Sequence, residues 1–463
     1  MVRIFRHYIA GVYLVLIFLE SGVFFASIFM DHAVRSYSQA QWLPPSTELT
    51  VAAIVFAIVM LASSTGMGLY QRTNVGDAAL LLRILASFML GTVIMSLVFY
   101  AFPDYFMGRR VFGHTLLAAG LGILLCRFLF LKIVDRQSLR RRVLVLGAGY
   151  HANMIQDLEN RATNLGFRVI GYIPMGNEPV RVARDRLLKM PIGLNVFATR
   201  ADIDEIVVAP DDRRDGLAVD EILDCKMAGH DVIDVPTFFE REAGLLRVDC
   251  LNPSWLAFSD GFRLNGAHQI NKRLFDIVAS LILLAVVWPV MLLTALAILI
   301  ESGWRAPILY RQARVGLNWK PFQAIKFRSM RTDAEKDGKA QWARTKDDRV
   351  TRVGGFIRKC RIDELPQLFN VLKGEMSFVG PRPERPEFVE KFAETIPYYS
   401  ERHRVKPGIT GWAQLCYPYG SNYHDAIEKL QYDLYYVKNY SLFLDLLIML
   451  QTIEVVVWGK GAR

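Results

Sequence analysis

The chain has 463 residues, enough for several domains, and 52% of them are hydrophobic, a share that argues against an ordinary soluble protein and indicates membrane segments. Its formal net charge of +10 predicts anionic partners such as lipid headgroups, phosphates or nucleotides, and we expect no nucleic-acid partner. The five cysteines are scattered, with no Cys-x-x-Cys pair and no histidine at ligand spacing, which argues against a disulfide framework and a zinc site and suits reducing cytosol.

Four apolar segments come first, each long enough to cross about 30 Å of hydrocarbon as a helix: roughly 8–30, 50–70, 81–102 and 112–133. Lysine and arginine are concentrated before the first segment, in the second loop and after the fourth, with Arg109 and Arg110 in the third loop as the exception. The positive-inside rule therefore predicts that the N-terminus and everything after residue 135 lie in the cytoplasm. For Glu20, in mid-span, we expect a structural partner such as Arg83 or a wet bundle interior.

The stretch RRVLVLGAGYHA (141–152) has a buried-type strand, Val143–Leu146, followed by Gly147-x-Gly149-x-x-Ala152 at the start of a helix. This is the outline of a Rossmann fingerprint. Further strands are predicted with helices between them, at 167–173, 204–210 and 230–236, so we expect a parallel sheet with helices on both faces. The second strand lacks the acid that holds a ribose hydroxyl, which favours a structural or regulatory module over a site for NAD.

Residues 277–300 form a fifth apolar stretch, without any charge and long enough to span a membrane. A crossing would put the rest of the chain outside, yet basic residues flank both ends: Lys272, Arg273, Arg305, Arg311 and Arg314. Pro289 lies in mid-segment, where proline removes a helical hydrogen bond and kinks the helix. A broken helix that returns on the same side satisfies both features, but hydropathy alone favours an ordinary crossing equally.

The segment RIDELPQ (361–367) places two carboxylates, Asp363 and Glu364, in a strongly basic region. Read alone, it is a plain helix start: Asp is a good N-cap, Pro366 is tolerated in a first turn, and LFNVLKG then runs to a stop at Gly374.

Four basic clusters recur across 305–440: KFRSM (326–330), RKCRIDELPQ (358–367), VGPRPERPE (379–387) and RHRVKPGITGWAQ (402–414). Taken singly, each reads as an edge strand, a helix start or a rigid turn. Taken together, four rigid basic segments around one acidic pair predict an anion pocket, because arginine binds phosphate bidentately and Pro- and Gly-fixed loops present backbone N–H groups.

These clusters, in this order, closely resemble the bacterial sugar transferases, the polyprenyl-phosphate hexose-1-phosphate transferases or monotopic phosphoglycosyl transferases, over about residues 268–463. The whole chain is similar to their large, exopolysaccharide-associated form. The resemblance implies that a nucleotide diphosphate sugar, commonly UDP-linked, gives its sugar-1-phosphate to undecaprenyl phosphate at the inner face of the bacterial cytoplasmic membrane. It also implies a re-entrant helix broken at Pro289 and admits a homodimer.

The resemblance maps a catalytic dyad onto Asp363, the nucleophile that forms an acyl-phosphate, and Glu364, which helps to bind Mg²⁺. A metal and cations are needed because a carboxylate attacking a diphosphate meets like charge. Six further residues are expected at the substrates: Arg358 and Arg382 as first choices for phosphate, Lys326 and Arg328 as second choices, and Pro381 and Pro383 shaping the loop beside the nucleotide.

The predicted fold is therefore a membrane α-helical bundle, an α/β Rossmann-like middle domain and a mainly helical α/β catalytic domain with a re-entrant membrane helix. The expected domains are 1–135, 140–250, a linker at 251–268, the re-entrant helix at 269–302 and the cytoplasmic catalytic domain at 303–463. The last apolar stretch, 442–458, carries Asp445, Gln451 and Glu454, and we expect an interfacial or packed helix there.

Two other functions remain open on the sequence. A membrane-tethered, NAD-dependent nucleotide-sugar enzyme would bind its cofactor at Gly147–Ala152 and would not need Asp363. The missing ribose acid and the absence of a Tyr-x-x-x-Lys pair count against it. A non-enzymatic scaffold for polysaccharide assembly would tolerate Asp363→Asn. The sequence does not identify the sugar.

Overall fold

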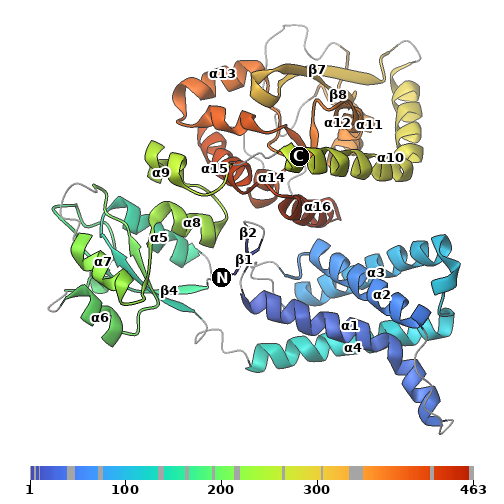
Figure 1. Cartoon of the computed structure of the whole chain (residues 1–463). Coiled ribbons are helices and arrows are strands. Elements are labelled where there is room, and N and C mark those ends of the chain that lie inside the picture. The colour runs from blue at the N-terminus through green and yellow to red at the C-terminus, as the bar shows by residue number, and fades with distance from the viewer. Residues whose placement is uncertain are drawn as a thin grey trace. The chain divides into compact units, whose positions relative to one another are not determined.

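A computed structural model describes residues 2–4, 7–9, 11–38, 47–70, 77–133, 140–161, 166–189, 193–212, 219–262, 266–303, 306–332, 348–417 and 422–457. Arg305, one of the cations flanking the fifth apolar stretch, lies outside them. The chain forms two compact units, Met1–Ile4 with Tyr8–Gly244 and Phe5–His7 with Leu245–Arg463, and each is described by itself (Figure 1).

Four apolar helices confirm the four predicted N-terminal segments: α1 (Gly11–Ser38), α2 (Thr47–Gly66), α3 (Asp77–Ala101) and α4 (Arg109–Ile133). Each is long and apolar enough to cross a membrane. Phe24, Phe56, Met60 and Met95 fill the core between them. The chain before α1 is not part of the first helix, because residues 2–4 and 7–9 form the short strands β1 (Val2–Ile4) and β2 (His7–Ile9).

Glu20 has an arginine partner that the sequence did not indicate. Its side chain is fully buried, and Arg127 of α4 reaches it with Nε at 2.6 Å from Oε1 and Nη2 at 3.2 Å from Oε2. The Tyr70 hydroxyl donates to Oε2 at 2.5 Å, whereas Arg83, the partner expected from the sequence, donates to the Gly68 carbonyl at 2.9 Å. A buried carboxylate with two donors is a structural group of the bundle, as expected.

The remainder of the first unit is an α/β region whose four strands, β3 (Arg141–Leu146), β4 (Phe167–Ile173), β5 (Glu205–Val208) and β6 (Asp231–Asp234), are all parallel in the order β4-β3-β5-β6. The helices are α5 (Tyr150–Arg161), α6 (Leu194–Arg200), α7 (Val219–Met227) and α8 (Val235–Ala243). The predicted parallel sheet is confirmed. Strand β6 ends earlier than expected because Asp234 caps α8, accepting from the Thr237 N–H at 3.1 Å.

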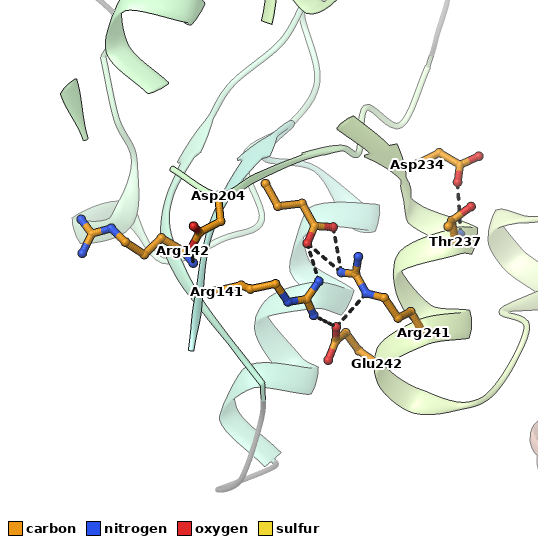
Figure 2. A network of polar contacts seen from close by, with 8 residues as sticks. Arg141, Arg142, Asp204, Asp234, Thr237, Arg241 and Glu242 are labelled. Carbon is orange, nitrogen blue, oxygen red and sulfur yellow. Dashed lines mark hydrogen bonds and ion pairs between the residues drawn. The ribbon is translucent and has the colours of Figure 1, made fainter. Parts of the chain in front are cut away.

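A closed ion cluster stabilises the amino ends of β3 and β5. Figure 2 shows Arg141 of β3 beside Arg241 and Glu242 of α8. Arg141 and Arg241 also hold Glu205, the first residue of β5, with both N–O distances at 2.7 Å. Two arginines and two glutamates balance in charge, and ligands of parallel sheets bind at the opposite, carboxyl edge. The cluster is therefore structural.

The second unit is mainly helical, as predicted. An antiparallel hairpin, β7 (Leu309–Val315) and β8 (Pro321–Phe327), and a parallel pair, β9 (Ser377–Val379) and β10 (Gly408–Thr410), lie among its helices. The helices are α9 (Pro253–Phe258), α10 (Gly266–Ser302), α11 (Arg352–Lys359), α12 (Gln367–Lys373), α13 (Pro386–Thr395), α14 (Trp412–Cys416), α15 (Tyr423–Asn439) and α16 (Leu442–Val457). Short 3-10 turns are η3 (Val248–Cys250), η4 (Leu317–Trp319), η5 (Ile362–Glu364) and η6 (Tyr399–Arg404).

Helix α16 is a packed helix, one of the two forms expected for the last apolar stretch. Leu444 and Ile448 are fully buried in the core of the unit, and Asp445 and Glu454 are buried as well. Tyr436 of α15 donates to Asp445 Oδ1 at 2.7 Å. The carboxylates of α16 therefore face the protein interior.

Helix α10 contains the whole fifth apolar stretch with Pro289 inside it, and its first and second parts run in different directions in Figure 1 (olive, then yellow). Near its start, Arg273 donates to the carbonyls of Val371 and Leu372 in α12, at 2.5 and 2.6 Å. At its end, Glu301 accepts from the Arg352 N–H at 2.7 Å, where α11 begins. Both ends of one apolar helix are thus attached to the same unit.

Lys272, one of the cations before the apolar stretch, is buried in the second unit. Its side chain is 4% exposed and contacts Asp276 Oδ1 at 2.8 Å and Asp445 Oδ2 at 2.9 Å. Asp276 also accepts from the Ser377 hydroxyl at 3.1 Å. The lysine joins α10, α16 and β9, so its charge stabilises the fold directly.

Candidate active site

The acidic pair lies in a 3-10 turn just before α12, and Asp363 does not cap that α-helix as the plain helix-start interpretation expected. Asp363 and Glu364 form η5, which follows α11 after Arg361 takes a left-handed conformation with φ of 58°. Helix α12 begins only at Gln367 and ends, as predicted, at the left-handed Gly374. The tight turn places the two carboxylates in different environments. Glu364 is 7% exposed, whereas Asp363 is half-buried.

Three cations from three separate segments surround Glu364. Lys326 Nζ, at the end of β8, and Arg382 Nη2, after β9, both lie 2.8 Å from Oε1. Arg361 Nη1 lies 3.8 Å from Oε2. The predicted gathering of basic segments at the acidic pair is therefore present for the clusters at 326–330, 358–367 and 379–387.

The pKa values of the two carboxyls are shifted in opposite directions, although the cations act to lower both. Burial favours the neutral form of Glu364, but Arg382 and Lys326 overcome it and hold the pKa of Glu364 well below its usual value. Burial and the neighbouring Glu364 charge raise the pKa of Asp363, while Lys326, Arg382 and Arg358 act to lower it. Glu364 is thus a fixed internal anion, and Asp363 is the more basic, more accessible carboxylate.

The loop that carries Arg382 is fixed by its own backbone. The Gly408 N–H donates to the Pro381 carbonyl at 2.9 Å, and Arg314 Nη1 donates to the Pro383 carbonyl at 3.1 Å. A Cβ added at Gly380 would lie 2.3 Å from the Lys406 carbonyl oxygen, so only glycine allows this close approach. The carbonyls of Pro381 and Pro383 thus anchor the loop on both sides of Arg382.

Arg402 also holds this loop, a role that the sequence did not reveal. Its Nη2 donates to the Arg382 carbonyl at 2.9 Å and contacts Asp433 Oδ2 at 2.8 Å, and its Nη1 donates to the Tyr399 hydroxyl at 2.7 Å. The guanidinium is buried with its counter-ion. Its cluster, 402–414, therefore acts behind the site and not in it. Arg402 is recognised by its buried ion pair between η6 and α15, and that pair can be seen only in the folded structure.

Asn370 fixes the distance between the acidic turn and β8. Its Oδ1 accepts from the Ile325 N–H at 3.0 Å, and its Nδ2 donates to the Gln323 carbonyl at 2.7 Å. The side chain is fully buried, and it joins α12 to the strand that carries Lys326. Sequence reasoning missed this residue, because an Asn inside a short helix carries no signal of its own.

The remaining predicted site residues are Arg358, Arg328 and Pro289. Arg358, in the last turn of α11, acts on Asp363 through its charge. Arg328 follows β8 and is buried, and within the described parts of the chain it makes no hydrogen bond to either carboxylate. Pro289 lies in α10, outside the site.

A Mg²⁺ ion at the pair would find a partial ligand set. Oε1 of Glu364 is committed to Lys326 and Arg382, which leaves Oε2 and the Asp363 carboxylate as the oxygen ligands. Mg²⁺ fits such a set, because it commonly takes one or two carboxylates and completes its shell with phosphates and water. Among the described residues, no group of three or more His, Cys, Asp or Glu side chains could hold a metal alone.

The glycine-rich turn of the first unit is occupied by the chain's own carboxylates. Asp211 accepts from the N–H groups of Tyr150 and His151 at 2.8 and 2.9 Å, and Glu178 accepts from the Ala148 N–H at 2.5 Å. These are N–H groups that a dinucleotide pyrophosphate uses in a Rossmann fold. A Cβ at Gly149 would lie 2.2 Å from Asp211, so this glycine makes room for a carboxylate. The arrangement disfavours a cofactor site here.

The fold and the site together define a membrane-associated protein with a cation-lined acidic site suited to anionic substrates. Residues 267–459 match the family described as bacterial sugar transferase. The chain is 44% identical over 239 residues to a UDP-N-acetylgalactosamine-undecaprenyl-phosphate N-acetylgalactosaminephosphotransferase of Aeromonas hydrophila, covering 52% of this chain and 55% of that protein.

Two other relatives extend the similarity. An undecaprenyl-phosphate glucose phosphotransferase of Komagataeibacter xylinus is 34% identical over 334 residues, 70% of this chain and 61% of that protein. An uncharacterized sugar transferase of Bacillus subtilis is 43% identical over 195 residues, 42% of this chain and 91% of that protein. The chain spans little more than half the length of the Aeromonas and Komagataeibacter proteins. It belongs to the bacterial sugar transferase family.

Proposed function

We propose that this protein transfers a sugar-1-phosphate from a nucleotide diphosphate sugar, a UDP-sugar by preference, to undecaprenyl phosphate, as a first membrane step of exopolysaccharide or other glycan synthesis. The observation that carries the proposal is the accessible, basic Asp363 beside the internal anion Glu364, within a ring of cations. The names of the relatives support the donor and acceptor classes, since several are undecaprenyl-phosphate sugar phosphotransferases.

In the first step, a carboxylate oxygen of Asp363 attacks the phosphorus that carries the sugar. A bond forms between Asp363 and that phosphorus, the diphosphate P–O bond breaks, and the nucleoside monophosphate leaves with the bridging oxygen. Arg382 and Arg358 are placed to neutralise the donor phosphates, and Lys326 is the second-rank contact. The raised pKa of Asp363 makes it a better nucleophile than an ordinary carboxylate.

In the second step, a phosphate oxygen of the lipid attacks the same phosphorus and displaces the Asp363 carboxylate. The product is a polyprenyl diphosphate sugar, and the nucleophile is regenerated with no net proton change on the enzyme. Two steps spare the enzyme the simultaneous alignment of a bulky lipid and a nucleotide sugar. When bound, Mg²⁺ would supply charge neutralisation on the phosphates, held by Asp363 and Glu364.

Lys326→Met should move the acid limb of the kcat/KM profile to higher pH by about one unit. Lys326 lowers the pKa of Asp363, so its removal raises that pKa, and the nucleophile is protonated at a higher pH. The measurement is UMP release against pH, with Lys320→Met, an exposed lysine just before β8, as control. An unmoved acid limb would contradict the role given to Lys326.

We propose that α10 is a re-entrant helix, broken at Pro289, with both ends in the cytoplasm of the bacterial inner membrane. In a straight helix Arg273 and Glu301 would be about 42 Å apart, yet they contact α12 and α11, which follow each other closely in one small unit. The bend seen in Figure 1 supports this geometry.

A cysteine scan tests the topology of α10. In a background without the five native cysteines, Ala306→Cys should react with a membrane-impermeant maleimide only after the inner membrane is permeabilised. Asp104→Cys, in η1 (Pro103–Tyr105) between α3 and α4, should react in spheroplasts without permeabilisation. Labelling of Ala306→Cys in intact spheroplasts would show that α10 crosses the bilayer.

We assign a role to each of the other parts of the chain. Residues 1–135 form the transmembrane domain, and the α/β region from 140 to Gly244 is a Rossmann-like domain with a structural or regulatory role. Residues from Leu245 onward, including the stretch 251–268 expected as a linker, belong to the second unit, which contains the re-entrant helix at 269–302 and the catalytic domain at 303–463. A homodimer is compatible with the large form of the family.

The test of the function is UMP release from a panel of UDP-sugars, with undecaprenyl phosphate and Mg²⁺, by the purified protein in nanodiscs. Release that needs the lipid for continued turnover is expected for one sugar or a few, which identifies the donor. Full activity in excess chelator would remove the metal from the proposal. No release from any nucleotide sugar would favour a scaffold in polysaccharide assembly.

A further inference from the structure

Arg328 is a buried arginine whose charge is not compensated. Its side chain is nine-tenths buried, with 7% of the residue exposed. Among the described residues, none accepts a hydrogen bond from Nη1 or Nη2. Burial lowers the pKa of this guanidinium, and the charge of Glu301 acts to raise it.

Three other buried cations of this unit have partners. Lys272 contacts two aspartates, Arg402 contacts Asp433, and Lys438 lies over the Trp255 ring. An isolated buried guanidinium is costly, because it gives up hydration and gains no partner. A ligand that accepts hydrogen bonds from the guanidinium removes this cost. Arg328 therefore indicates a binding site for an anion, which the free protein lacks.

The position of Arg328 shows where that anion lies. Its N–H donates to the Ile308 carbonyl at 2.9 Å, one residue beyond β8, and Lys326 of the acidic site is two residues earlier, about 7 Å along the chain. Phe327 and Ile308 pack with Ile298 of α10. Arg328 therefore directly follows the strand that carries Lys326, and its guanidinium is close enough to the end of α10 to be influenced by the charge of Glu301.

Glu301 does not serve as the missing counter-ion. Its two carboxylate oxygens accept from the N–H groups of Arg352 and Val353 at the start of α11, at 2.7 to 3.3 Å. The Glu301 carboxylate caps the N-terminus of α11, and it influences Arg328 through its charge without a direct contact.

We propose that Arg328 binds the phosphate of the acceptor lipid. The inference rests on the proposed function, in which α10 lies in the membrane and the lipid phosphate arrives at its surface. The donor diphosphate has Arg382, Arg358 and Lys326 at the acidic pair, whereas Arg328 lies on the side of α10. A guanidinium holds a phosphate monoester through two parallel N–H···O bonds, which lysine cannot reproduce.

The kinetic test compares Arg328→Met and Arg328→Lys with wild type, each substrate being varied in turn. Arg328→Met should raise KM for undecaprenyl phosphate about tenfold to hundredfold and leave KM for the nucleotide sugar within about twofold. Arg328→Lys should recover part of the loss. Arg311→Met, an exposed cation on β7, is the matched control. A rise in KM for the nucleotide sugar would assign Arg328 to the donor and overturn the proposal.

Thermal unfolding separates a binding role from a structural one. Removal of an unpaired buried charge should leave the unfolding midpoint of Arg328→Met unchanged or raise it. A lower midpoint together with losses for both substrates would show that Arg328 only supports the fold, contrary to the proposal.

A binding measurement does not depend on turnover. In nanodiscs containing undecaprenyl phosphate, Asp363→Asn protein should unfold at a higher temperature than in nanodiscs without it, and the Asp363→Asn/Arg328→Met protein should show no such shift. Equal shifts would overturn the assignment of Arg328, whereas failure of the proposed function would appear as lack of turnover in wild type.

Discussion

Asp363→Asn should lower the rate of sugar-phosphate transfer by about a thousandfold or more. The amide has nearly the shape of the carboxylate but is not nucleophilic, so the acyl-phosphate cannot form. Asp363 is half-buried, and the cations around the pair keep Glu364 as their anion after the change. The measurement is UMP release by wild type and variant at saturating donor and lipid.

Two controls make this experiment decisive. Glu390→Gln, an exposed carboxylate on α13, should keep full activity. The unfolding midpoint of Asp363→Asn should remain near that of wild type, which separates lost chemistry from lost folding. Radiolabelled donor should leave a sugar phosphate on wild-type protein without lipid and none on the variant. Turnover by Asp363→Asn at even a tenth of the wild-type rate would exclude it as the nucleophile.

Glu364→Gln should be damaging in a different way, through both rate and stability. Lys326 and Arg382 share Oε1, and loss of the carboxylate charge leaves both partly buried cations without their common anion. Breaking such a pair from one side costs about 3 kcal/mol, at the low end of the range because the two cations are partly exposed. We expect the unfolding midpoint to fall by several degrees and transfer to fall about a hundredfold, since Arg382 loses its fixed position.

The pH dependence of unfolding identifies this mechanism. The folded pKa of Glu364 is depressed below its ordinary value of 4.5, so its contribution to stability is present above that pH and is lost as the pH falls toward the folded value. Wild type should therefore lose more stability on acidification below pH 4.5 than Glu364→Gln does. Glu387→Gln, exposed on α13, should behave as wild type. Parallel acid curves for wild type and Glu364→Gln would refute the ion-pair account.

Local patterns in the sequence were sufficient for the elements and for the family. Four apolar runs predicted α1 to α4, because a helix long enough to cross a bilayer needs an uninterrupted apolar stretch. The strand at 143–146 and its three partners followed from short β-branched runs, and Gly374 ended α12 because a left-handed residue stops a helix. The order of the basic clusters indicated the sugar transferase family.

Partner identities were decided by the tertiary structure, because an ion pair has no sequence signal when its members are far apart. Glu20 pairs with Arg127, 107 positions away, a partner that the sequence did not indicate. Lys272 flanks the apolar stretch, as its position in the sequence shows, and only the structure reveals that Asp445 and Asp276 hold it inside the protein. Burial, which makes these pairs obligatory, is a property of the packed chain.

The sequence by itself determined that an acidic pair lies among basic segments, and only the fold decided what each residue does there. Packing places Glu364 under Lys326 and Arg382 and leaves Asp363 at the opening, so two adjacent carboxylates acquire opposite pKa shifts. Packing also fills the glycine-rich turn with Asp211 and leaves Arg328 without an anion. The sequence gives the charges and their spacing along the chain. The energy of each charge depends on its desolvation and on its distance from other charges, and both are determined only when the segments pack together.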